Sequence, residues 1–306
     1  MTVADEREGW GRQRFRRRKV RLLAKVLGSA VLGIGTLGYS YFIEPFWLEV
    51  THTAVRLPNL PPSFDGLRLV VISDIHYGWR VGERQLRRVV ERTNAQQPDV
   101  ICLLGDYVTR RAGYRFPTLL ARLVAKEGIF AVLGNHDYFG HEQANVGWLQ
   151  SGGAQVLRNQ HATLEREGAH LHFAGVEDLR SHNYDLPAAL RGLPGTECRV
   201  LLAHNPDFVD RIAGQRVDLM LCGHTHGGQV ILPFFGAPHL PHKHEELLRG
   251  YCDHHGLPLY VSRGIGMSGI PHRLRARPEI AVLTLHRALK MASCSGLQGA
   301  SASRSA

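Results

Sequence analysis

The five cysteines of the sequence include no C-x-x-C pair; they are Cys102, Cys198, Cys222, Cys252 and Cys294. An odd number of cysteines without metal-ligand spacing argues against a disulfide framework and against a zinc knuckle. Cys102 and Cys222 lie inside apolar runs, where a thiol usually acts as a small core residue. Cysteine usage therefore does not decide the compartment in which the protein works.

Several common site motifs are missing as well. The sequence has no G-x-S-x-G nucleophile elbow, no P-loop and no internal repeat. Gly264–Gly269 matches the letters G-x-G-x-x-G, but Pro271 follows at once and no helix opens there, so the context of a dinucleotide-binding motif is absent.

Positive charge is not spread over the chain as it is in a nucleic-acid-binding domain. The net charge is +10, but residues 1–25 hold nine Lys and Arg against three Asp and Glu, a net of +6. The rest of the chain carries 28 basic and 24 acidic residues, a net of only +4. Most of the excess is a terminal feature, so we expect no nucleic-acid partner. The 44% hydrophobic and 21% charged residues indicate a folded protein.

An uncharged run of 18 residues, Val26–Ile43, follows a basic cluster at Arg16–Arg21. This length reaches the threshold for a membrane-spanning helix, and the aromatic residues at its far end are typical of a membrane interface. We predict a basic segment at 1–25 and a transmembrane anchor or uncleaved signal at 26–45. A buried core helix and a cleaved signal peptide are the alternatives. The positive-inside rule places residues 1–25 in the cytoplasm and everything after about residue 45 on the far side of the membrane.

One folded domain is predicted at 67–288, between a linker and a tail. The prolines Pro58, Pro61 and Pro62 mark residues 46–66 as the linker. Residues 289–306 are rich in Ser, Ala and Gly, which predicts a disordered tail.

Short continuous apolar runs inside this domain predict strands that are buried on both faces. Helical stretches at Glu83–Gln97 and Pro117–Lys126 separate the first three runs, which indicates a β-α-β-α-β unit. Ala154–Leu179 predicts a hairpin in a second sheet, and Gly256–Leu285 predicts a strand, a turn and a strand.

Five short polar motifs each follow an apolar run; they are Asp74-Ile75-His76, Gly105-Asp106, Gly134-Asn135-His136-Asp137, His204-Asn205 and Gly223-His224-Thr225-His226-Gly227-Gly228. Open α/β sheets place their ligands beyond the carboxyl ends of the strands. Carboxylate, amide and imidazole groups are the mixed ligands that two hard-to-borderline metal ions need. The five motifs together therefore indicate hydrolytic phosphoester chemistry.

The motifs differ in how much they indicate alone. Asp74 and His76 are two residues apart, so at a strand end both side chains would point the same way, and His224 and His226 would share a face for the same reason. A carboxylate such as Asp106 can bridge metals roughly 3.5–4 Å apart. Taken singly, the Asp74 and Asp106 motifs are better explained as turns, and His204 as a hydrogen-bonded core or turn histidine. Only the order of all five motifs indicates a metal site.

His136 is an acid–base candidate, and Asp137 beside it could orient or charge-stabilise its imidazole. A second group of histidines remains outside the five motifs; it comprises His239, His242, His244, His254 and His255. For this stretch we predict a solvent loop near the active face, with a further metal site as the alternative.

The ordered motifs resemble the calcineurin-like metallophosphoesterase superfamily over residues 67–228. Further matches at Ile231-Leu232-Pro233, Arg263-Gly264 and Arg277-Pro278-Glu279 resemble its YaeI/YkuE-type branch of bacterial membrane-anchored or exported phosphodiesterases. The resemblance implies an α/β fold, a four-layer α-β-β-α sandwich with two metals above the strand ends, joined here to an N-terminal transmembrane helix.

The resemblance also implies a role for each motif residue. One metal would be held by Asp74, His76, Asp106 and His226, and the other by Asp106, Asn135, His204 and His224, with Asp106 bridging. His136 would be catalytic, near the leaving-group oxygen, with Asp137 behind it.

We therefore expect a membrane-anchored phosphoesterase that hydrolyses a phosphodiester or pyrophosphate bond with a hydroxide bridging two divalent metal ions. The ligands suit Mn, Fe or Zn, with Mn favoured. The anchor motivates a lipid-linked substrate and a single-pass location in the bacterial inner membrane, with the catalytic domain on the extracytoplasmic face. The alternatives are a UDP-2,3-diacylglucosamine-type pyrophosphatase of lipid A synthesis, a metal-dependent nuclease and a non-catalytic metal-dependent binding module. No oligomeric state is indicated.

Overall fold

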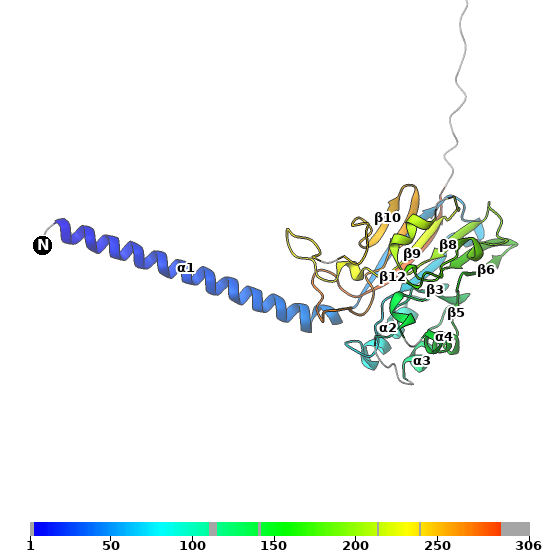
Figure 1. Ribbon diagram of the computed structural model, residues 1–306, viewed down its shortest axis with the longest axis horizontal. Coiled ribbons are helices and arrows are strands. Elements are labelled where there is room, and N and C mark those ends of the chain that lie inside the picture. The colour runs from blue at the N-terminus through cyan, green and yellow to red at the C-terminus, as the bar shows by residue number, and fades with distance from the viewer. Residues whose placement is uncertain (1–2, 110–114, 140–141, 213, 239, 289–306) are drawn as a thin grey trace, which may run out of the picture.

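A single long helix, α1 (Val3–Phe42), projects from a body built of two β-sheets (Figure 1). The computed structural model describes residues 3–109, 115–139, 142–212, 214–238 and 240–288, so the predicted tail at 289–306 lies outside the described residues. Within the described residues, one segment, Arg17–Phe46, is long and apolar enough to cross a membrane, and its apolar window is 0% buried. The helix begins well before the predicted anchor and includes much of the basic segment.

The first sheet has six strands in the order β1-β12-β2-β3-β4-β5. Their bounds are Glu49–Leu57 for β1, Arg68–Ile72 for β2, Val100–Leu103 for β3, Gly128–Ala131 for β4, Gln155–Val156 for β5 and Glu279–Arg287 for β12. Neighbours are parallel except for β12 and β2. The helices α2 (Glu83–Asn94) and α3 (Arg115–Leu120) connect β2, β3 and β4, which confirms the predicted β-α-β-α-β unit.

Strand β1 corrects the predicted linker at 46–66. All nine of its residues pair with β12, from Glu49 opposite Glu279 to Leu57 opposite Arg287. Val55 and Leu57 are fully buried in the core. The prolines lie just after this strand, where they mark a turn and the short helix Pro62–Phe64. The sheet therefore begins at Glu49 and not at residue 67, because the prolines end a strand instead of forming a spacer.

The second sheet also has six strands, in the order β10-β11-β9-β8-β7-β6. Their bounds are Gln160–Arg166 for β6, Ala169–Gly175 for β7, Cys198–Leu202 for β8, Leu219–Cys222 for β9, Gly250–His254 for β10 and Leu257–Val261 for β11. The antiparallel pair β6–β7 confirms the predicted hairpin in a second sheet. The two strands predicted in Gly256–Leu285 exist as β11 and β12, but they lie in different sheets.

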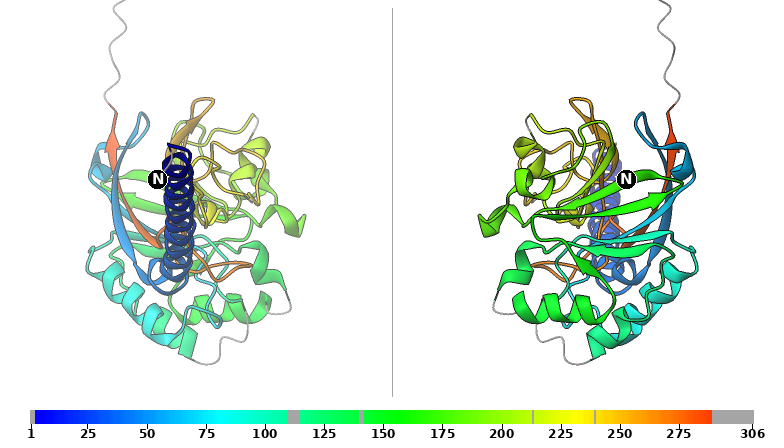
Figure 2. Two further views of the ribbon diagram at one scale, coloured as in Figure 1. Left: turned by 90° about the vertical axis from the view of Figure 1, so that its left-hand side faces the viewer. Right: turned by 90° about the vertical axis from the view of Figure 1, so that its right-hand side faces the viewer.

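Strand residues alternate between three buried layers, which explains why the apolar runs are continuous. In β2, Leu69 and Val71 point into the core between the two sheets, whereas Val70 and Ile72 pack on the outer face of the first sheet. That outer face is covered by α2, α3 and α4 (Glu142–Ser151), which lie together on one side of the body (Figure 2). The outer face of the second sheet packs against α5 (Leu186–Ala189) and the short helix Pro206–Arg211. This arrangement is the predicted four-layer α-β-β-α sandwich.

The last turn of α1 is fixed to the loop 272–276 of the domain. Ser40 accepts the backbone N–H of Arg273 at 2.9 Å with its carbonyl, and its hydroxyl contacts Nδ1 of His272 at 2.9 Å. The buried Glu44, just after the helix, accepts the N–H of Ala276 at 2.6 Å. The domain is therefore joined to the end of α1 by several buried polar contacts and not by a free tether.

Candidate metal centre

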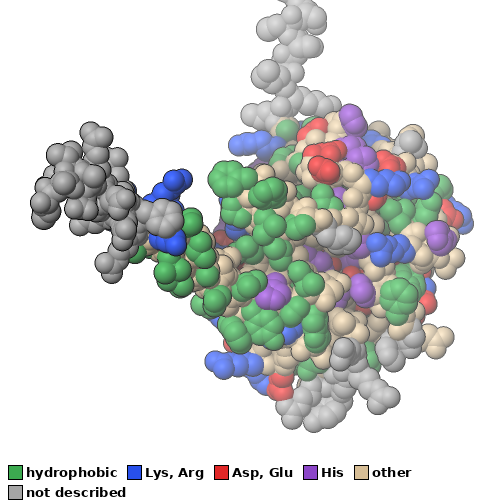
Figure 3. Space-filling model, turned by 60° about the vertical axis from the view of Figure 1, so that its left-hand side comes forward, with side chains coloured by type: hydrophobic (Ala, Val, Ile, Leu, Met, Phe, Trp, Pro, Cys, Tyr) green, Lys and Arg blue, Asp and Glu red, His purple; other side chains and the backbone are tan. Residues whose placement is uncertain are grey.

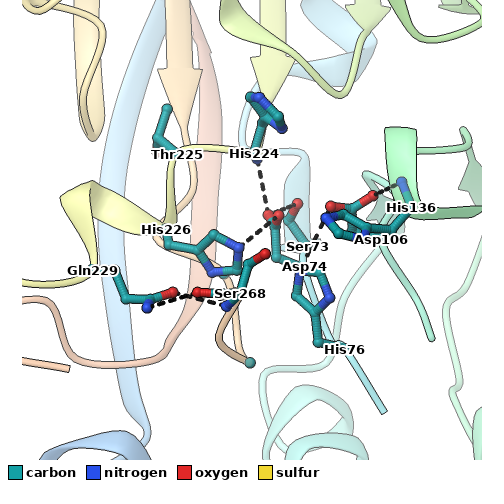
Figure 4. A network of polar contacts seen from close by, with 12 residues as sticks. Ser73, Asp74, His76, Asp106, His136, His224, Thr225, His226, Gln229 and Ser268 are labelled. Atoms are coloured by element: carbon teal, nitrogen blue, oxygen red, sulfur yellow. Dashed lines mark hydrogen bonds and ion pairs between the residues drawn. The ribbon is translucent and has the colours of Figure 1, made fainter. Parts of the chain in front are cut away.

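The five predicted motifs meet at one edge of the sandwich. Three follow β2, β3 and β4 of the first sheet, and two follow β8 and β9 of the second. Their side chains form two neighbouring groups of potential metal ligands, Asp74 with His76 and His226, and Asp106 with His204 and His224. Figure 4 labels Asp74, His76, His226, Asp106 and His224 at this site. Within each group the ligand atoms lie within 4.8 Å of one another, and all six residues are buried.

Asp106 stands between the two groups. Its Oδ2 atom lies 3.5 Å from Nε2 of His76 and 3.3 Å from Nε2 of His204. Its Oδ1 atom accepts the backbone N–H of His136 at 2.8 Å. One carboxylate oxygen thus faces an imidazole of each group, which is the placement expected of a ligand shared by two ions.

Hydrogen bonds from the outer side of the site select the nitrogen that faces inward. Nδ1 of His204 lies 2.6 Å from the carbonyl oxygen of Leu104, which can only accept, so this nitrogen carries a proton. Nε2 is then the nitrogen that can exchange a proton for a cation. On the other side, Nδ1 of His76 contacts the hydroxyl of Thr109 at 2.8 Å, and its Nε2 points toward Asp106.

Four buried polar atoms at the site have no hydrogen-bond partner; they are Asp74 Oδ1, His76 Nε2, Asn135 Oδ1 and His224 Nε2. Buried polar groups without partners are rare in folded proteins because each one forfeits its hydration. Here they are oxygens and imidazole nitrogens of the residues predicted to bind metal. The donor set therefore fits two divalent cations, which would satisfy these atoms.

The pKa values show how strongly the protein opposes charge here when no cation is present. Burial raises the pKa of Asp74 to about 6 and lowers the pKa of His76 to about 4 and of His224 to about 3. Burial also opposes charge on His204, but the adjacent Asp106 carboxylate raises the pKa of His204 well above its usual value. In the metal-free protein His204 and Asp106 therefore form a buried ion pair, and a cation has to displace a proton from it.

The backbone of the ligand loops adopts an unusual conformation. Asp74, His76, Asp106, His224 and His226 have φ of 51°, 47°, 56°, 70° and 52°. Non-glycine residues enter this left-handed region at a cost, and such residues concentrate at functional sites.

This conformation differs from the strand geometry that was predicted to bring Asp74 and His76 together. Strand β2 ends at Ile72, so the two side chains converge through left-handed loop residues and not through strand alternation. His224 and His226 do not share a face either, because His226 joins the group of Asp74 and His224 joins that of Asp106. The backbone N–H of His224 is donated to Oδ2 of Asp74 at 3.0 Å, which ties the two groups together.

Glycines let the ligand loops approach one another closely. A Cβ atom on Gly223 would lie 1.8 Å from the Ser73 hydroxyl oxygen and 2.5 Å from Oδ2 of Asp74. A Cβ on Gly264, which has φ of 64°, would lie 2.7 Å from Cβ of Asp74. Gly264 and Gly266, the first two glycines of the G-x-G-x-x-G letters, thus make room for the Asp74 loop, a role that the sequence did not reveal.

Within the described residues, the hydrogen bonds of the Asp137 carboxylate do not include one to the imidazole of His136. Its carboxylate accepts the backbone N–H groups of Asp106 at 2.7 Å, Tyr107 at 2.9 Å and Gly134 at 2.8 Å. Burial and the nearby Asp106 raise the pKa of Asp137 to about 7, against the lowering effect of these amides. Asp137 was predicted to orient His136. The structure instead shows its carboxylate bonded to the backbone of the loop that carries Asp106.

A cavity of about 580 Å³ opens beside the two groups and is lined by Asp106, Asn135, His136, His224 and His226 among others. His136 is only partly buried, and its ring lies 5.0 Å from that of His76. Arg180, an exposed residue of the short helix Leu179–Ser181, also lines the cavity. Arg180 could not be predicted from the sequence, because a single arginine in a loop has no distinguishing pattern.

A second residue that sequence reasoning missed is Arg273. Its side chain is fully buried, and it donates to the carbonyl oxygens of Gly266 at 2.9 Å and Ala276 at 2.7 Å. Burial lowers the pKa of Arg273 to about 9. Arg273 therefore stabilises the loop between Gly266 and Ala276. This loop contacts Ser40 of α1 at one point and the backbone of Asp74 at another.

An α-β-β-α sandwich with two adjacent oxygen and imidazole ligand groups at one edge defines the class of metal-dependent phosphoesterases. Residues 67–228 match the family model described as calcineurin-like phosphoesterase. The chain is 33% identical to the metallophosphoesterase YkuE of Bacillus subtilis, over 86% of this chain and 94% of that protein. It is 32% identical to phosphodiesterase YaeI of Escherichia coli, over 81% and 92%.

Another relative is the UDP-2,3-diacylglucosamine pyrophosphatase LpxG of Chlamydia trachomatis, which is 27% identical over 80% of this chain and 90% of its own length. The chain belongs to the calcineurin-like phosphoesterase family, in the branch of YkuE and YaeI. It is a metal-dependent phosphoric ester hydrolase.

Proposed function

We propose that the protein is a membrane-anchored phosphodiesterase or pyrophosphatase that uses two divalent metal ions and acts on a lipid-linked substrate. Asp74, His76, Asp106 and His226 would hold one ion, and Asp106, Asn135, His204 and His224 the other, with manganese favoured. The observation that carries the chemistry is the position of Asp106 between the two ligand groups, 3.5 Å from His76 and 3.3 Å from His204.

Two bound cations would polarise the phosphoryl oxygens and make water a nucleophile at neutral pH. The residues of the chain supply the remaining functions. His136 faces the cavity beside Asp106, where its imidazolium would give a proton to the leaving oxygen as the P–O bond breaks. Arg180 lines the same cavity and would pair with a phosphate oxygen of the substrate.

The cavity is lined by apolar as well as polar side chains. Val230, Leu240 and Ile270 line it together with the polar residues. An apolar rim is formed by exposed side chains in the segment between the cavity residues Val230 and Pro238, namely Leu232, Phe234 and Phe235, together with Ile270; Phe234 is 103% and Phe235 85% exposed. A substrate with a phosphate at one end and acyl chains at the other matches this combination of polar and apolar surfaces.

The position of the rim supports a location at the membrane. Gln229 donates to the carbonyl of Ile270 at 3.0 Å, and the loop that continues from Ile270 reaches His272, which contacts Ser40 of α1. Figure 3 shows apolar side chains gathered on the face that adjoins the end of α1. Exposed phenylalanines beside a spanning helix are costly in water and favourable in a bilayer interface. With the basic residues before the span, this favours a bacterial inner-membrane protein whose catalytic domain faces away from the cytoplasm.

A nuclease and a non-catalytic binding module are the competing functions. The charge outside the first 25 residues is only +4, which disfavours a DNA-binding groove. A binding module would keep its metals without turnover, so measured hydrolysis distinguishes it from an enzyme.

The experiment uses the full chain in vesicles, loaded with manganese. Three substrates are compared: a lipid-linked nucleotide pyrophosphate, the same compound without its acyl chains and a generic soluble phosphodiester. We expect a kcat/KM for the lipid-linked compound at least about tenfold above that for its soluble counterpart, the difference that burial of one or two large apolar groups supplies.

The double variant Phe234→Ser/Phe235→Ser should lose most of that advantage while it hydrolyses the soluble diester normally. Equal kcat/KM on the lipid-linked and the deacylated compound would rule out the lipid-linked substrate. Hydrolysis of none of the three would favour the binding module.

A further inference from the structure

A second cluster of metal-competent side chains lies outside the centre described above. His244 and Glu246 belong to the loop before β10, and His254 is the last residue of β10. Nδ1 of His244 and Nδ1 of His254 each lie 3.5 Å from Oε1 of Glu246. The three ligand atoms are within 4.8 Å of one another. We propose that His244, Glu246 and His254, here named the histidine clip, bind one zinc ion.

The spacing of the clip is that of ligands around a cation. Zinc binds imidazole nitrogen and carboxylate oxygen at about 2.0–2.2 Å, so two ligands of a tetrahedral ion lie roughly 3.4 Å apart. The two 3.5 Å separations in the clip match this value and equal the distance between His226 and Asp74 at the metal centre. They are longer than ordinary hydrogen bonds, as expected where groups share a cation and not a proton.

A carboxylate outside the clip sets the orientation of one ring. Oδ1 of Asp210 lies 3.0 Å from Nε2 of His244. A carboxylate at this nitrogen holds its proton there and leaves the Nδ1 lone pair toward Glu246, the arrangement by which metal-binding histidines are usually fixed. Lys243 forms an ion pair with the same aspartate, with Nζ 3.8 Å from Oδ2 of Asp210.

Two imidazoles with one carboxylate select the class of ion. Imidazole nitrogens suit zinc and its neighbours in the transition series, whereas magnesium and calcium require oxygen ligands. The side chains of His254 and His244 are 15% and 25% exposed, and that of Glu246 is 61% exposed. An ion can therefore enter directly from solvent, and the remaining coordination position is open to water.

A zinc ion bound by the clip would stabilise the loop that lines one side of the catalytic cavity. Leu240 and Pro241, which line the cavity, come shortly before His244 in the same loop. Farther along this loop, the carbonyl of Leu248 accepts the hydroxyl of Thr225, which lies between two residues of the metal centre. An ion shared by this loop and β10 would hold the cavity wall against the second sheet without taking part in the reaction.

The test is equilibrium dialysis of the full chain in detergent against micromolar free zinc, followed by measurement of bound zinc per chain. His254→Ala and His244→Ala should each bind one equivalent less than wild type. His52→Ala, at an exposed histidine of β1, is the matched control and should bind as wild type does. Equal zinc contents in wild type and both clip variants would overturn the proposal, since an ion pair of His with Glu246 then accounts for the cluster.

Amide hydrogen exchange of residues 242–254 provides a second measurement that does not depend on activity. Zinc should slow exchange there in wild type and in His52→Ala, and have no such effect in His254→Ala. If the clip variants lose one equivalent of zinc but zinc does not slow amide exchange in wild type, the zinc site stands and its role in stabilising the loop is refuted. Because each comparison is between variants with an intact metal centre, the result is independent of the proposed phosphoesterase function.

Discussion

The carboxylate of Asp137 accepts the backbone N–H of Asp106 at 2.7 Å and that of Gly134 at 2.8 Å with the same oxygen. Its other oxygen accepts the N–H of Tyr107 at 2.9 Å. These bonds fix the loop whose side chain faces both ligand groups. We therefore infer that Asp137 acts on the reaction through Asp106, as a positioning residue.

Asp137→Asn tests this role. An amide has one acceptor oxygen, and its NH2 group would face a backbone donor, so the Asp106 loop should loosen. We expect weaker manganese binding, by roughly tenfold or more for one or two lost charge-assisted hydrogen bonds, and activity that recovers at high manganese. Measuring activity as a function of manganese concentration tests both the weaker binding and the recovery. A fall in kcat that saturating manganese does not restore would instead indicate a direct part in catalysis.

His136→Asn should separate catalysis from metal binding. The side chain of His136 lines the cavity, whereas its contact with Asp106 is made by its backbone N–H. The variant should therefore keep the metal content of wild type and lose roughly 10²–10⁴-fold in turnover, the usual contribution of a general acid. Metal analysis and kcat on one preparation provide the check. Loss of metal would show that the assigned role is wrong.

Arg180→Ala should weaken substrate binding, because it removes an exposed guanidinium from the cavity that contains the ligand groups. A hydrogen bond to a charged group contributes about 1.5–3 kcal/mol, so KM should rise roughly tenfold or more with little change in metal content. Arg180→Lys should recover part of the loss. Arg191→Ala, at an exposed arginine near α5, is the control. An unchanged KM in Arg180→Ala would remove this residue from the substrate site.

Asp74 makes the metal-free protein sensitive to pH. Its pKa is raised by burial from 3.8 to about 6, so the folded state binds more protons than the unfolded state between these values. The free energy of unfolding of the chelated protein should therefore fall as pH rises from about 4 to about 6. Asp74→Asn should unfold at higher urea concentration than wild type at pH 7 without metal, and the exposed Glu91→Gln should not. A loss of stability in Asp74→Asn would contradict the raised pKa.

The sequence predicted the ligand residues better than it predicted the reasons for their convergence. Five motifs after apolar runs were enough to gather Asp74, Asp106 and His204, because parallel strands bring their carboxyl ends to one edge. The left-handed backbone at His76 and His224 could not be anticipated, since φ at a loop residue depends on the packing of neighbouring loops. The same dependence hid the role of Gly264, whose lack of a side chain matters only against Asp74.

Secondary structure outside the motifs was predicted less evenly. Prolines after Leu57 indicated a linker, and β1 was missed because its partner β12 lies more than two hundred residues away in the sequence. Arg180 and Arg273 were missed for a related reason. Their functions arise from tertiary contacts, and neither stands in a local pattern.

We propose that Asp106 joins two metal sites that carry out hydrolysis. The most direct test compares wild type and Asp106→Ala for manganese content and for hydrolysis of a generic phosphodiester, with the exposed Glu91→Gln as the control. Wild type and control should bind two manganese ions and hydrolyse the diester, while Asp106→Ala should lose metal and its rate of hydrolysis should fall by roughly 10³-fold or more. Equal rates in wild type and Asp106→Ala would contradict it.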